Sequence, residues 1–445
     1  MMRIQLLGKA LTLCLAMLLS PVHLLGQQTQ PTRQVHEVKP KDTLYSIAQR
    51  YGVPLDQLYT LNPWARKQIN PGDILIISAG ELTPKEKAQP RPIQEAHPTY
   101  PAREEAEPEQ AIRPEIRVAL MLPLASQKTY VEFYEGFLMG INDLKKNGIS
   151  IELFVHDIPQ DETLDRLIAR GSLTGLDLVF GGVNEYQIER IVRSRGYGHY
   201  VIPFHRYASL DQAGDRVIQI NPPASALIAR AADTFIRKYK SMEVCFVRRT
   251  EDGDDPFAHH LKVALGKAGI RYRVVNITSQ YLGVLGRNTV VVPVSPSKPL
   301  LQQLLAQLDP NDACTLFGYP QWQSYGDEVT KQMHKYGTTI YASFFFDPYQ
   351  SDATDFLTKY HAWFNKKIGA SYPKMAVLGY DLARYFIRSY AALGQGFMKE
   401  SWLLPSDGLQ SDLVLSSSGH AGGYYNQRFY FVRYDRNGNI HREAL

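Results

Sequence analysis

Hydrophobic and polar positions follow distinct patterns along the chain, and these patterns predict its secondary structure. From about residue 115 onward, short apolar runs such as IRVALML at residues 116–122 alternate with stretches in which apolar residues recur every three or four positions. The short runs are typical of buried strands, and the wider spacing is typical of amphipathic helices. Their regular alternation favours parallel sheets covered by helices on both faces, so we expect an α/β fold.

The alternation occurs in two rounds, which predicts two lobes. The first round covers about residues 115–222, and the second begins near residue 224. Two amphipathic stretches, DATDFLTKYHAWFNKKIG and MAVLGYDLARYFIRSYAALG, follow, and RFYFVRY near the end predicts a last strand. We expect the first lobe to contain residues 115–222 and 350–396, and the second lobe to contain residues 223–349 and the C-terminal strands.

Residues 35–78 show a separate pattern that predicts a small domain. An alternating stretch, VHEV, is followed by two short segments with helical spacing and by a closing apolar run, ILII. Asp42 and Thr43 have side chains suited to cap the first helix, and Gly52 is suited to end it. The predicted order is strand, helix, helix, strand.

This order and its residues resemble the LysM module, which binds the N-acetylglucosamine of peptidoglycan and chitin. The resemblance rests on D-T-L-x-x-I-A-x-x-Y-x-V, on L-x-x-L-N and on I-x-P-G-D-x-L-x-I, and Lys41 stands where the family usually carries glycine. It implies a shallow sugar groove between the turn before the first helix and the loop before the last strand. The residues implied for glycan binding are Lys41, Asp42, Thr43, Leu44, Asn62, Pro63, Ile69, Asn70, Pro71 and Gly72. For Leu44 and Ile69, a place in the domain core is an equally good interpretation.

The C-terminal part resembles the type I periplasmic binding protein fold, the clamshell of leucine-binding proteins, over about residues 115–445. The order of the elements carries the resemblance, together with the phrases MLPLASQ, YEGFLMGIND, FGGVNEYQ and VLGYDLARYFI. With a LysM module on the same chain, the sequence is similar to LysM-bearing members from the Bacteroidetes group of Gram-negative bacteria.

In such folds, ligands lie between the lobes at the carboxyl ends of the parallel strands. This rule gives candidate cleft residues from both lobes: Ser126, Gln127, Asn184, Glu185, His205, Arg206, Arg249 and Tyr319. Amino-acid-binding members usually carry small hydroxyl residues where this chain has VNEY, and Glu185 would repel a carboxylate. The sequence leaves three possibilities for the cleft, which are an amino-bearing ligand, a muropeptide or no ligand at all. For each candidate residue, the alternative to ligand contact is a helix-capping or surface role.

The N-terminal residues predict secretion. Residues 1–26 combine a positive start at Arg3 and Lys9, an apolar run too short to span a bilayer, and a small residue before the expected cleavage site. Residues 27–34 form a short segment, and residues 79–114, rich in proline and charge, predict a flexible linker. We expect a periplasmic, peptidoglycan-associated protein without a membrane span.

Composition and motifs argue against several kinds of chemistry. The formal charge of +5 is spread along the chain and does not favour nucleic-acid binding. Cys245 and Cys314 lie in apolar segments, which favours buried thiols, and a disulfide between them is the alternative in an oxidising compartment. The acidic turn at residues 251–255 lacks the ligand spacing of a calcium loop and suits a helix entry. No nucleophile elbow, zinc-protease pair or phosphate loop occurs, so we expect no metal, no cofactor and no catalysis.

The leading hypothesis is a non-catalytic, wall-bound protein. The LysM module would hold glycan strands of peptidoglycan, and the clamshell would act as a sensor or as a regulatory domain for a cell-wall protein partner. The alternative is a solute-binding protein for amino acids or peptides that serves a transporter or receptor. A wall hydrolase with a LysM targeting module is a third class, and it lacks a recognised catalytic motif here.

Overall fold

The computed structural model describes residues 34–39, 42–62, 65, 69, 73–78, 115–277, 285, 288–308, 314–403 and 406–445. The chain divides into two compact units, Met1–Tyr100 and Pro101–Leu445. Each unit has its own hydrophobic core, so each can be understood from its own residues.

The first unit has the predicted order of strand, helix, helix and strand. Its elements are β1 (Gln34–Glu37), α1 (Leu44–Tyr51), α2 (Leu55–Leu61) and β2 (Ile74–Ser78), and the two strands pair antiparallel. A capping box begins α1, because the Thr43 hydroxyl accepts from the Ser46 amide while the Ser46 hydroxyl accepts from the Thr43 amide. The helix ends at Gly52, whose φ of 66° is a left-handed conformation that suits glycine. Ile47 from α1 and Leu58 from α2 are fully buried in the small core.

A network of polar side chains holds β1 to α1. His36 is buried, with Nε2 2.8 Å from an Asp42 carboxylate oxygen and Nδ1 2.9 Å from the Tyr51 hydroxyl. The Asp42 carboxylate also accepts hydrogen bonds from the Lys39 amide at 3.0 Å and from the Arg50 guanidinium at 3.1 Å. The bond from the Lys39 amide, followed by the contact with His36, lowers the pKa of Asp42 from 3.8 to about 2. Both Asp42 oxygens are therefore engaged within the domain.

Seven strands form the first sheet of the larger unit, in the order β13-β14-β7-β6-β5-β3-β4. The strands are β3 (Ile116–Leu122), β4 (Ile151–Asp157), β5 (Leu178–Gly181), β6 (His199–Ile202), β7 (Val217–Gln219), β13 (Leu415–Ser417) and β14 (Tyr424–Asn426). All neighbours are parallel except β13 and β14, which pair antiparallel. The associated helices are α3 (Lys128–Lys146), α4 (Asp161–Ala169), α5 (Glu185–Arg193), α10 (Ser351–Phe364) and α11 (Met375–Leu393), with the 3-10 segments η2 (Leu210–Gln212) and η4 (Gly394–Leu403).

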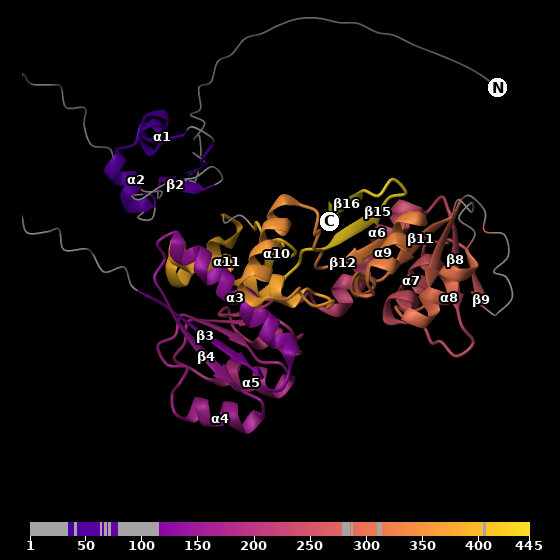
Figure 1. Ribbon diagram of the computed structural model, residues 1–445, viewed down its shortest axis with the longest axis horizontal. Coiled ribbons are helices and arrows are strands. Elements are labelled where there is room, and N and C mark those ends of the chain that lie inside the picture. The colour runs from indigo at the N-terminus through magenta and orange to yellow at the C-terminus, as the bar shows by residue number, and fades with distance from the viewer. Residues whose placement is uncertain are drawn as a thin grey trace, which may run out of the picture. The chain divides into compact units, whose positions relative to one another are not determined.

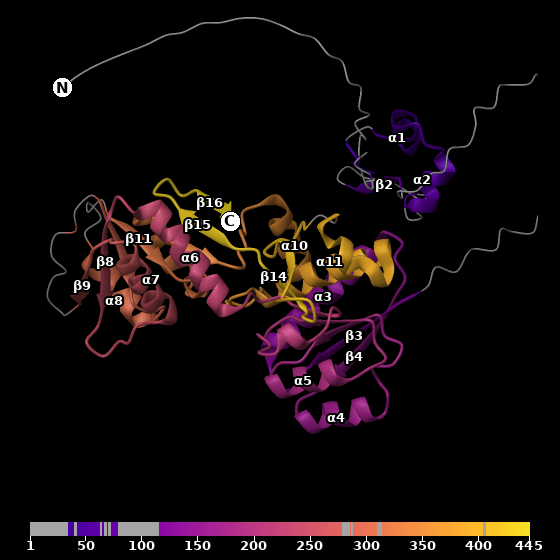
Figure 2. The same ribbon diagram turned by 180° about the vertical axis from the view of Figure 1, so that it is seen from behind.

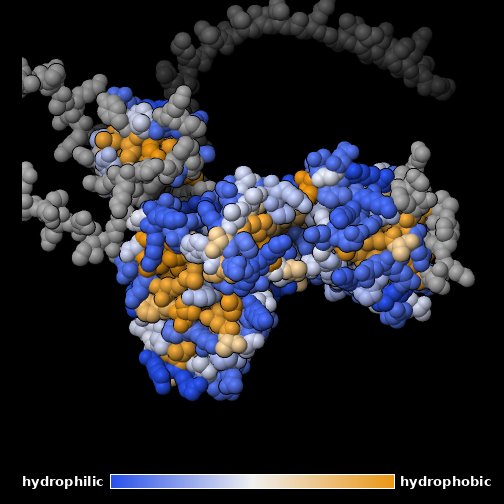
Figure 3. Space-filling model, in the orientation of Figure 1, coloured by the Kyte–Doolittle hydropathy of each residue, from blue (hydrophilic) through white to orange (hydrophobic). Residues whose placement is uncertain are grey.

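Helices cover both faces of this sheet, as the sequence pattern predicts. Figure 1 shows α3 and α11 on one side of β3 and β4, with α4 and α5 on the other, and Figure 2 shows the same layers from behind. Alternate residues of β3 enter the two layers, because Leu120 packs in the core of α3 and α11 whereas Met121 packs in the core of α4 and α5. The outer strand β4 is only partly buried over residues 153–156, and Figure 3 shows apolar residues at the surface over β3 and β4.

The second sheet also has seven strands, in the order β16-β15-β12-β11-β10-β8-β9. The strands are β8 (Glu243–Arg248), β9 (Tyr272–Asn276), β10 (Thr289–Pro293), β11 (Thr315–Gly318), β12 (Thr339–Ala342), β15 (Tyr430–Tyr434) and β16 (Ile440–Ala444). The helices are α6 (Ala224–Tyr239), α7 (Pro256–Lys267), α8 (Lys298–Gln307) and α9 (Asp327–Lys335), with the 3-10 segment η3 (Pro320–Ser324). Strands β15 and β16 are antiparallel additions to an otherwise parallel sheet.

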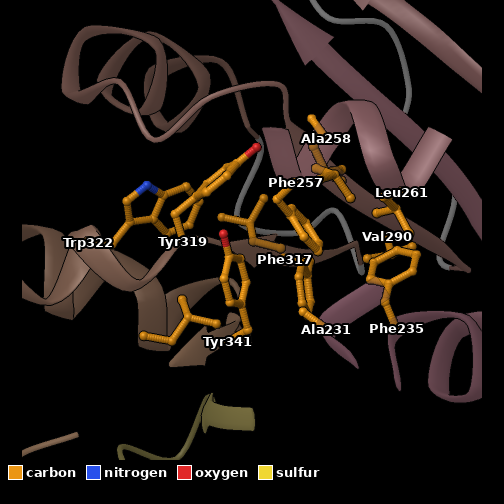
Figure 4. Packing of buried hydrophobic residues seen from close by; sticks show 14 of the residues in the cluster. Ala231, Phe235, Phe257, Ala258, Leu261, Val290, Phe317, Tyr319, Trp322 and Tyr341 are labelled. Atoms are coloured by element: carbon orange, nitrogen blue, oxygen red, sulfur yellow. The ribbon is translucent and has the colours of Figure 1, made fainter. Parts of the chain in front are cut away.

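Aromatic side chains fill the core of the second lobe. Phe317 on β11 stacks on Phe257 at a centroid distance of 5.7 Å and meets Phe235 edge-on at 4.9 Å, as can be followed in Figure 4. Tyr319 and Tyr341 pack beside them, with centroids 6.1 Å apart. These pairs have the geometry in which aromatic rings attract one another, so the sheet and its helices are fixed together here.

The C-terminal strands are divided between the two sheets, which corrects the expectation that they all belong to the second lobe. β14 pairs with β7 and extends the first sheet, whereas β15 pairs with β12 in the second. The chain therefore passes from the first sheet to the second after β7, returns after β12, and crosses again between β14 and β15.

The closest packing in the first lobe is between the backbones of α3 and α11. A Cβ atom added at Gly136 would lie 1.7 Å from the Ala376 carbonyl oxygen, and one added at Gly379 would lie 2.0 Å from the Phe133 carbonyl oxygen. No side chain larger than hydrogen fits at either position without moving a helix.

We predict that Gly136→Ala lowers the free energy of unfolding by about 1–3 kcal/mol or more, because the new methyl group forces the helices apart. The matched control is Gly266→Ala on α7, where nothing lies within 4 Å of the added Cβ. The control should be neutral or stabilising by about 0.5–1 kcal/mol, since alanine is the better helix former. Urea unfolding followed by circular dichroism measures both, and equal midpoints for the two variants would contradict this packing.

A second prediction concerns acid unfolding of the first unit. The pKa of Asp42 is lower in the folded state than its ordinary value of 3.8, so its stabilisation is complete above about pH 4 and is lost as the pH falls toward 2. Thermal melts of a fragment of residues 27–100 should show a melting temperature that drops across this interval. Asp42→Asn should melt lower at pH 7 and depend less on pH between 4 and 2, whereas Glu37→Gln, on the exposed side of β1, should melt like the wild type at pH 7. An unchanged melting temperature for Asp42→Asn at pH 7 would show that the network contributes nothing.

Candidate functional site

The implied glycan groove is described only in part. Lys41, Pro63, Asn70, Pro71 and Gly72 lie outside the described residues. The remaining five members of the implied site are Asp42, Thr43, Leu44, Asn62 and Ile69, and the structure gives them different positions.

Two of these residues have structural roles that the sequence does not reveal. Asn62 is fully buried, and its amide group donates to the carbonyls of Leu58 at 2.9 Å and Ile76 at 2.7 Å, while its oxygen accepts from the Ile76 amide at 2.7 Å. Asn62 therefore joins α2 to β2 from inside the domain and is not available to a sugar, which corrects its assignment to the groove. Asp42 is committed to the His36 network, with both oxygens occupied.

The other three residues can still meet a ligand. Thr43 is exposed while it caps α1, and Leu44 and Ile69 are half-buried against the domain core. Leu44 and Ile69 thus combine the two interpretations that the sequence leaves open, since each packs on the core and keeps part of its surface outside. Apolar surface of this kind can cover the methyl of an acetamido group.

The Asp42 network is completed by His36, Arg50 and Tyr51, which no motif in the sequence singles out. The signal was present in the alternation of VHEV, because His36 shares the buried side of β1 with Val38. A buried imidazole needs hydrogen-bond partners, and an acid six residues later is a suitable one.

At the carboxyl ends of the first-lobe strands, the candidate cleft residues cap and brace the loops. Ser126 is exposed and its hydroxyl donates to the Pro123 carbonyl at 3.3 Å, and the exposed Gln127 precedes α3. Asn184 is the N-cap of α5, where its side-chain oxygen accepts from the Gln187 amide at 2.8 Å and its amide group donates to Asp161 at 3.0 Å.

The structure brings Glu185 and His205 together at this edge. A Glu185 carboxylate oxygen lies 3.2 Å from His205 Nε2, and the carboxylate also accepts from the Ala208 amide at 3.3 Å. Next to them, the Arg206 guanidinium is exposed and donates through Nε to the Pro222 carbonyl at 2.8 Å. The Glu185 carboxylate therefore has local partners in the His205 ring and the Ala208 amide.

In the second lobe, neither candidate is free to meet a ligand as expected. Arg249 forms an ion pair with Asp252 at 2.7 Å and another with Glu251 at 3.1 Å, all within one loop. The hydrogen bonds that the Arg249 guanidinium donates to the Asp252 carboxylate raise the pKa of Arg249 and lower the pKa of Asp252. Tyr319 is only 1% exposed and its hydroxyl donates to the Pro293 carbonyl at 2.9 Å, so it is a core residue and not part of a cleft wall. Figure 4 shows its ring among the other aromatic side chains.

The acidic turn is a helix entry, as its residues indicate. Asp255 is the N-cap of α7, and its carboxylate accepts from the Phe257 amide at 2.8 Å. Within the described residues, no three His, Cys, Asp or Glu side chains come together as metal ligands. Cys245 and Cys314 are both buried as thiols, in agreement with the interpretation from their apolar segments. No helix in the described part of the chain is both long and apolar enough to cross a lipid bilayer.

Comparison with known proteins gives a family for the first unit. The sequence pattern of the LysM domain matches residues 36–78. No curated protein sequence matches the chain. The match coincides with the described β1, α1, α2 and β2, so sequence and structure identify the same domain.

Solved structures resemble the larger unit. A protein from Rhodospirillum rubrum, assigned to a branched-chain amino acid ABC transporter, is 14% identical with a TM-score of 0.52, and the match covers 74% of this chain and 100% of that chain. The leucine complex of an ABC transporter substrate-binding protein from Desulfitobacterium hafniense is 14% identical with a TM-score of 0.45, covering 74% and 100%. LpoA from Haemophilus influenzae is 14% identical with a TM-score of 0.44, covering 74% of this chain and 58% of that one.

A sequence identity of 14% supports a shared fold but not a shared ligand. The shared fold agrees with the two mainly parallel sheets and their helical layers. The chain combines a LysM domain at residues 36–78 with a two-lobed domain that has the fold of type I periplasmic binding proteins.

Proposed function

We propose that this protein is a non-catalytic, periplasmic peptidoglycan-binding protein. Its LysM domain would hold glycan that contains N-acetylglucosamine, and its two-lobed domain would act as a sensor or as an interaction domain in cell-wall biology. The observation that carries the proposal is the LysM match over residues 36–78, together with the domain's complete order of strands and helices.

The described part of the groove suits an acetamido sugar. Exposed Thr43 offers a hydroxyl, and half-buried Leu44 and Ile69 offer apolar surface. Main-chain groups of the loop before β2 would pair with the amide of the sugar. Asn70, Pro71 and Gly72 in that loop remain part of the proposed site.

The larger domain is proposed as a sensor or interaction domain because two of its candidate cleft side chains already have charged or polar partners. Glu185 is engaged by His205, and Arg249 is engaged by Asp252. A solute carrier needs polar groups that are left for its ligand. Attachment to a wall-binding module also raises the effective concentration of the second domain at the wall, which serves a stationary sensor better than a diffusing carrier.

The alternative function is solute binding for a transporter or receptor, and the shared fold is the observation that favours it. A carrier should be stabilised against heat by its ligand, with an effect that grows with ligand concentration. Arg206→Ala should abolish that stabilisation if the ligand lies in the cleft. A third possibility, a wall hydrolase, would require purified sacculi to be cleared.

We predict that the full chain sediments with purified sacculi and that Asn70→Ala lowers the retained fraction several-fold. The reason is that Asn70 would contact the sugar from the loop before β2. The matched control is Gln57→Ala on α2, outside the proposed groove, which should be retained like the wild type. Retained fractions are measured by sedimentation, and thermal melts of each variant establish that it is folded.

Two outcomes would contradict this prediction in different ways. Equal retention of Asn70→Ala and the wild type would remove Asn70 from the site while leaving glycan binding intact. A wild-type chain that stays in the supernatant would overturn the proposed function.

A further inference from the structure

A cavity lies at the amino ends of strands in the first sheet, opposite the carboxyl ends that lead to the candidate cleft residues. It has a volume of about 640 Å³ and is lined by the segments that lead into β5, β6 and β7, by η4 and by β14. The candidate cleft residues follow the carboxyl ends of the same strands, so cavity and cleft are separate sites. The volume falls within the range of about 300–1,000 Å³ that is typical of small-molecule sites.

His199, the first residue of β6, lines this cavity, and one of its ring nitrogens has no hydrogen-bond partner. Its side chain belongs to a residue only 7% exposed, and its ring lies 4.6 Å from that of Phe397 in η4. Among the described residues, its Nδ1 is buried and has no hydrogen-bond partner. Burial lowers the pKa of His199 to about 4, against an opposing influence of the nearby Asp215 carboxylate. The neutral imidazole has one donor and one acceptor nitrogen, and leaving the buried Nδ1 without a partner is costly.

Two charged groups of the cavity wall belong to the scaffold. The Asp177 carboxylate accepts from the Tyr390 hydroxyl at 2.6 Å and from the Arg117 amide at 2.8 Å. The Arg216 guanidinium lies over the Tyr197 ring and donates to the carbonyls of Val192 and Ser194. These bonds fix the loops before β5 and β7, so neither charge is left for a ligand.

The other two charged groups of the wall are available. Asp215 precedes β7 and Lys399 lies in η4, and both are exposed at the cavity. In the described part of the chain neither side chain forms a hydrogen bond or an ion pair, and Asp215 acts on His199 through its charge alone. One unused acid and one unused base match a ligand that carries an ammonium and a carboxylate. A neutral sugar would satisfy neither charge.

The geometry points to a binding site for a short peptide with free ends, of about two or three residues by the size of the cavity. The peptide's ammonium group pairs with Asp215, its carboxylate pairs with Lys399, and an amide of its main chain hydrogen-bonds to His199. This site is additional to the glycan groove and to the cleft, and it requires neither of them.

The test is isothermal titration of the full chain with tri-alanine. We expect a single site, and we expect N-acetyl-tri-alanine and tri-alanine amide each to bind at least about tenfold more weakly, since each lacks one charge-assisted contact. Asp215→Asn should weaken tri-alanine by a similar factor and leave the affinity for the N-acetyl form unchanged. Lys399→Met should behave in the same way toward the amide. Comparing each variant with its blocked peptide therefore shows which end of the peptide contacts Asp215 and which contacts Lys399.

Matched controls separate this site from the rest of the molecule. Asp211→Asn, an exposed acid in the neighbouring η2, and Arg206→Ala in the cleft should both bind tri-alanine like the wild type. His199→Phe should lose binding while its circular dichroism spectrum stays that of the wild type; if it fails to fold, the two charge variants decide the question. Absence of tri-alanine binding, binding that survives both charge variants, or binding that is lost in Arg206→Ala would each overturn the proposal.

Discussion

The contact between α3 and α11 is the constraint on which the two-lobed domain depends. Gly136 and Gly379 let the two backbones meet, and the pair covers one face of the first sheet. These helices are far apart in sequence, because the whole second sheet except β15 and β16 is formed between them. The first lobe can therefore be completed only after the chain has left it and returned. The contact also fixes the strand ends that carry the cleft residues, and α11 leads directly into η4, which forms a wall of the peptide cavity.

Buried polar groups extend this constraint to the loops. Asp381 on α11 is buried and accepts hydrogen bonds from the amides of Leu409, Gln410 and Ser411, at 2.8 to 3.0 Å. Burial raises its pKa to about 7 although these bonds oppose the effect. The Gln410 carbonyl in turn accepts from the Phe345 amide, in the segment that returns from the second sheet. One carboxylate thus attaches α11 both to the segment before β13 and, through Gln410, to a crossing between the lobes. The same device appears in the LysM domain, where Asn62 joins α2 to β2.

Much of the fold could be predicted from the sequence, because the hydrophobic period of each long element matches its structure. The three-residue strands β13 and β14 could not, since a Ser-rich and a Tyr-rich stretch of that length have no period to detect. Their pairing with β7 is a tertiary choice, and it also explains why the C-terminal strands are divided between the sheets. At the sites, residue type was informative and side-chain direction was not. Asn62 and Tyr319 have the polar groups that a ligand needs, but the structure directs both inward to main-chain carbonyls. Such a direction is set by neighbours distant in sequence, which no local pattern reports.

The strands of the first sheet separate the cavity at their amino ends from the cleft at their carboxyl ends. The two sites can therefore be tested separately. β6 has four residues, from His199 at the cavity to Ile202 near the cleft. Three steps of about 3.3 Å separate these two residues by about 10 Å, and the cleft residue Arg206 follows four positions after Ile202 in the chain. Substitutions more than about 7–10 Å apart with no shared partners usually act additively. His199 and Arg206 share no partner among the described residues, since the His199 ring contacts Tyr390 and Phe397 while Arg206 donates to Pro222. A substitution at one end of the strands should therefore leave binding at the other end intact. The effect of each substitution on a peptide then shows at which end of the strands that peptide binds.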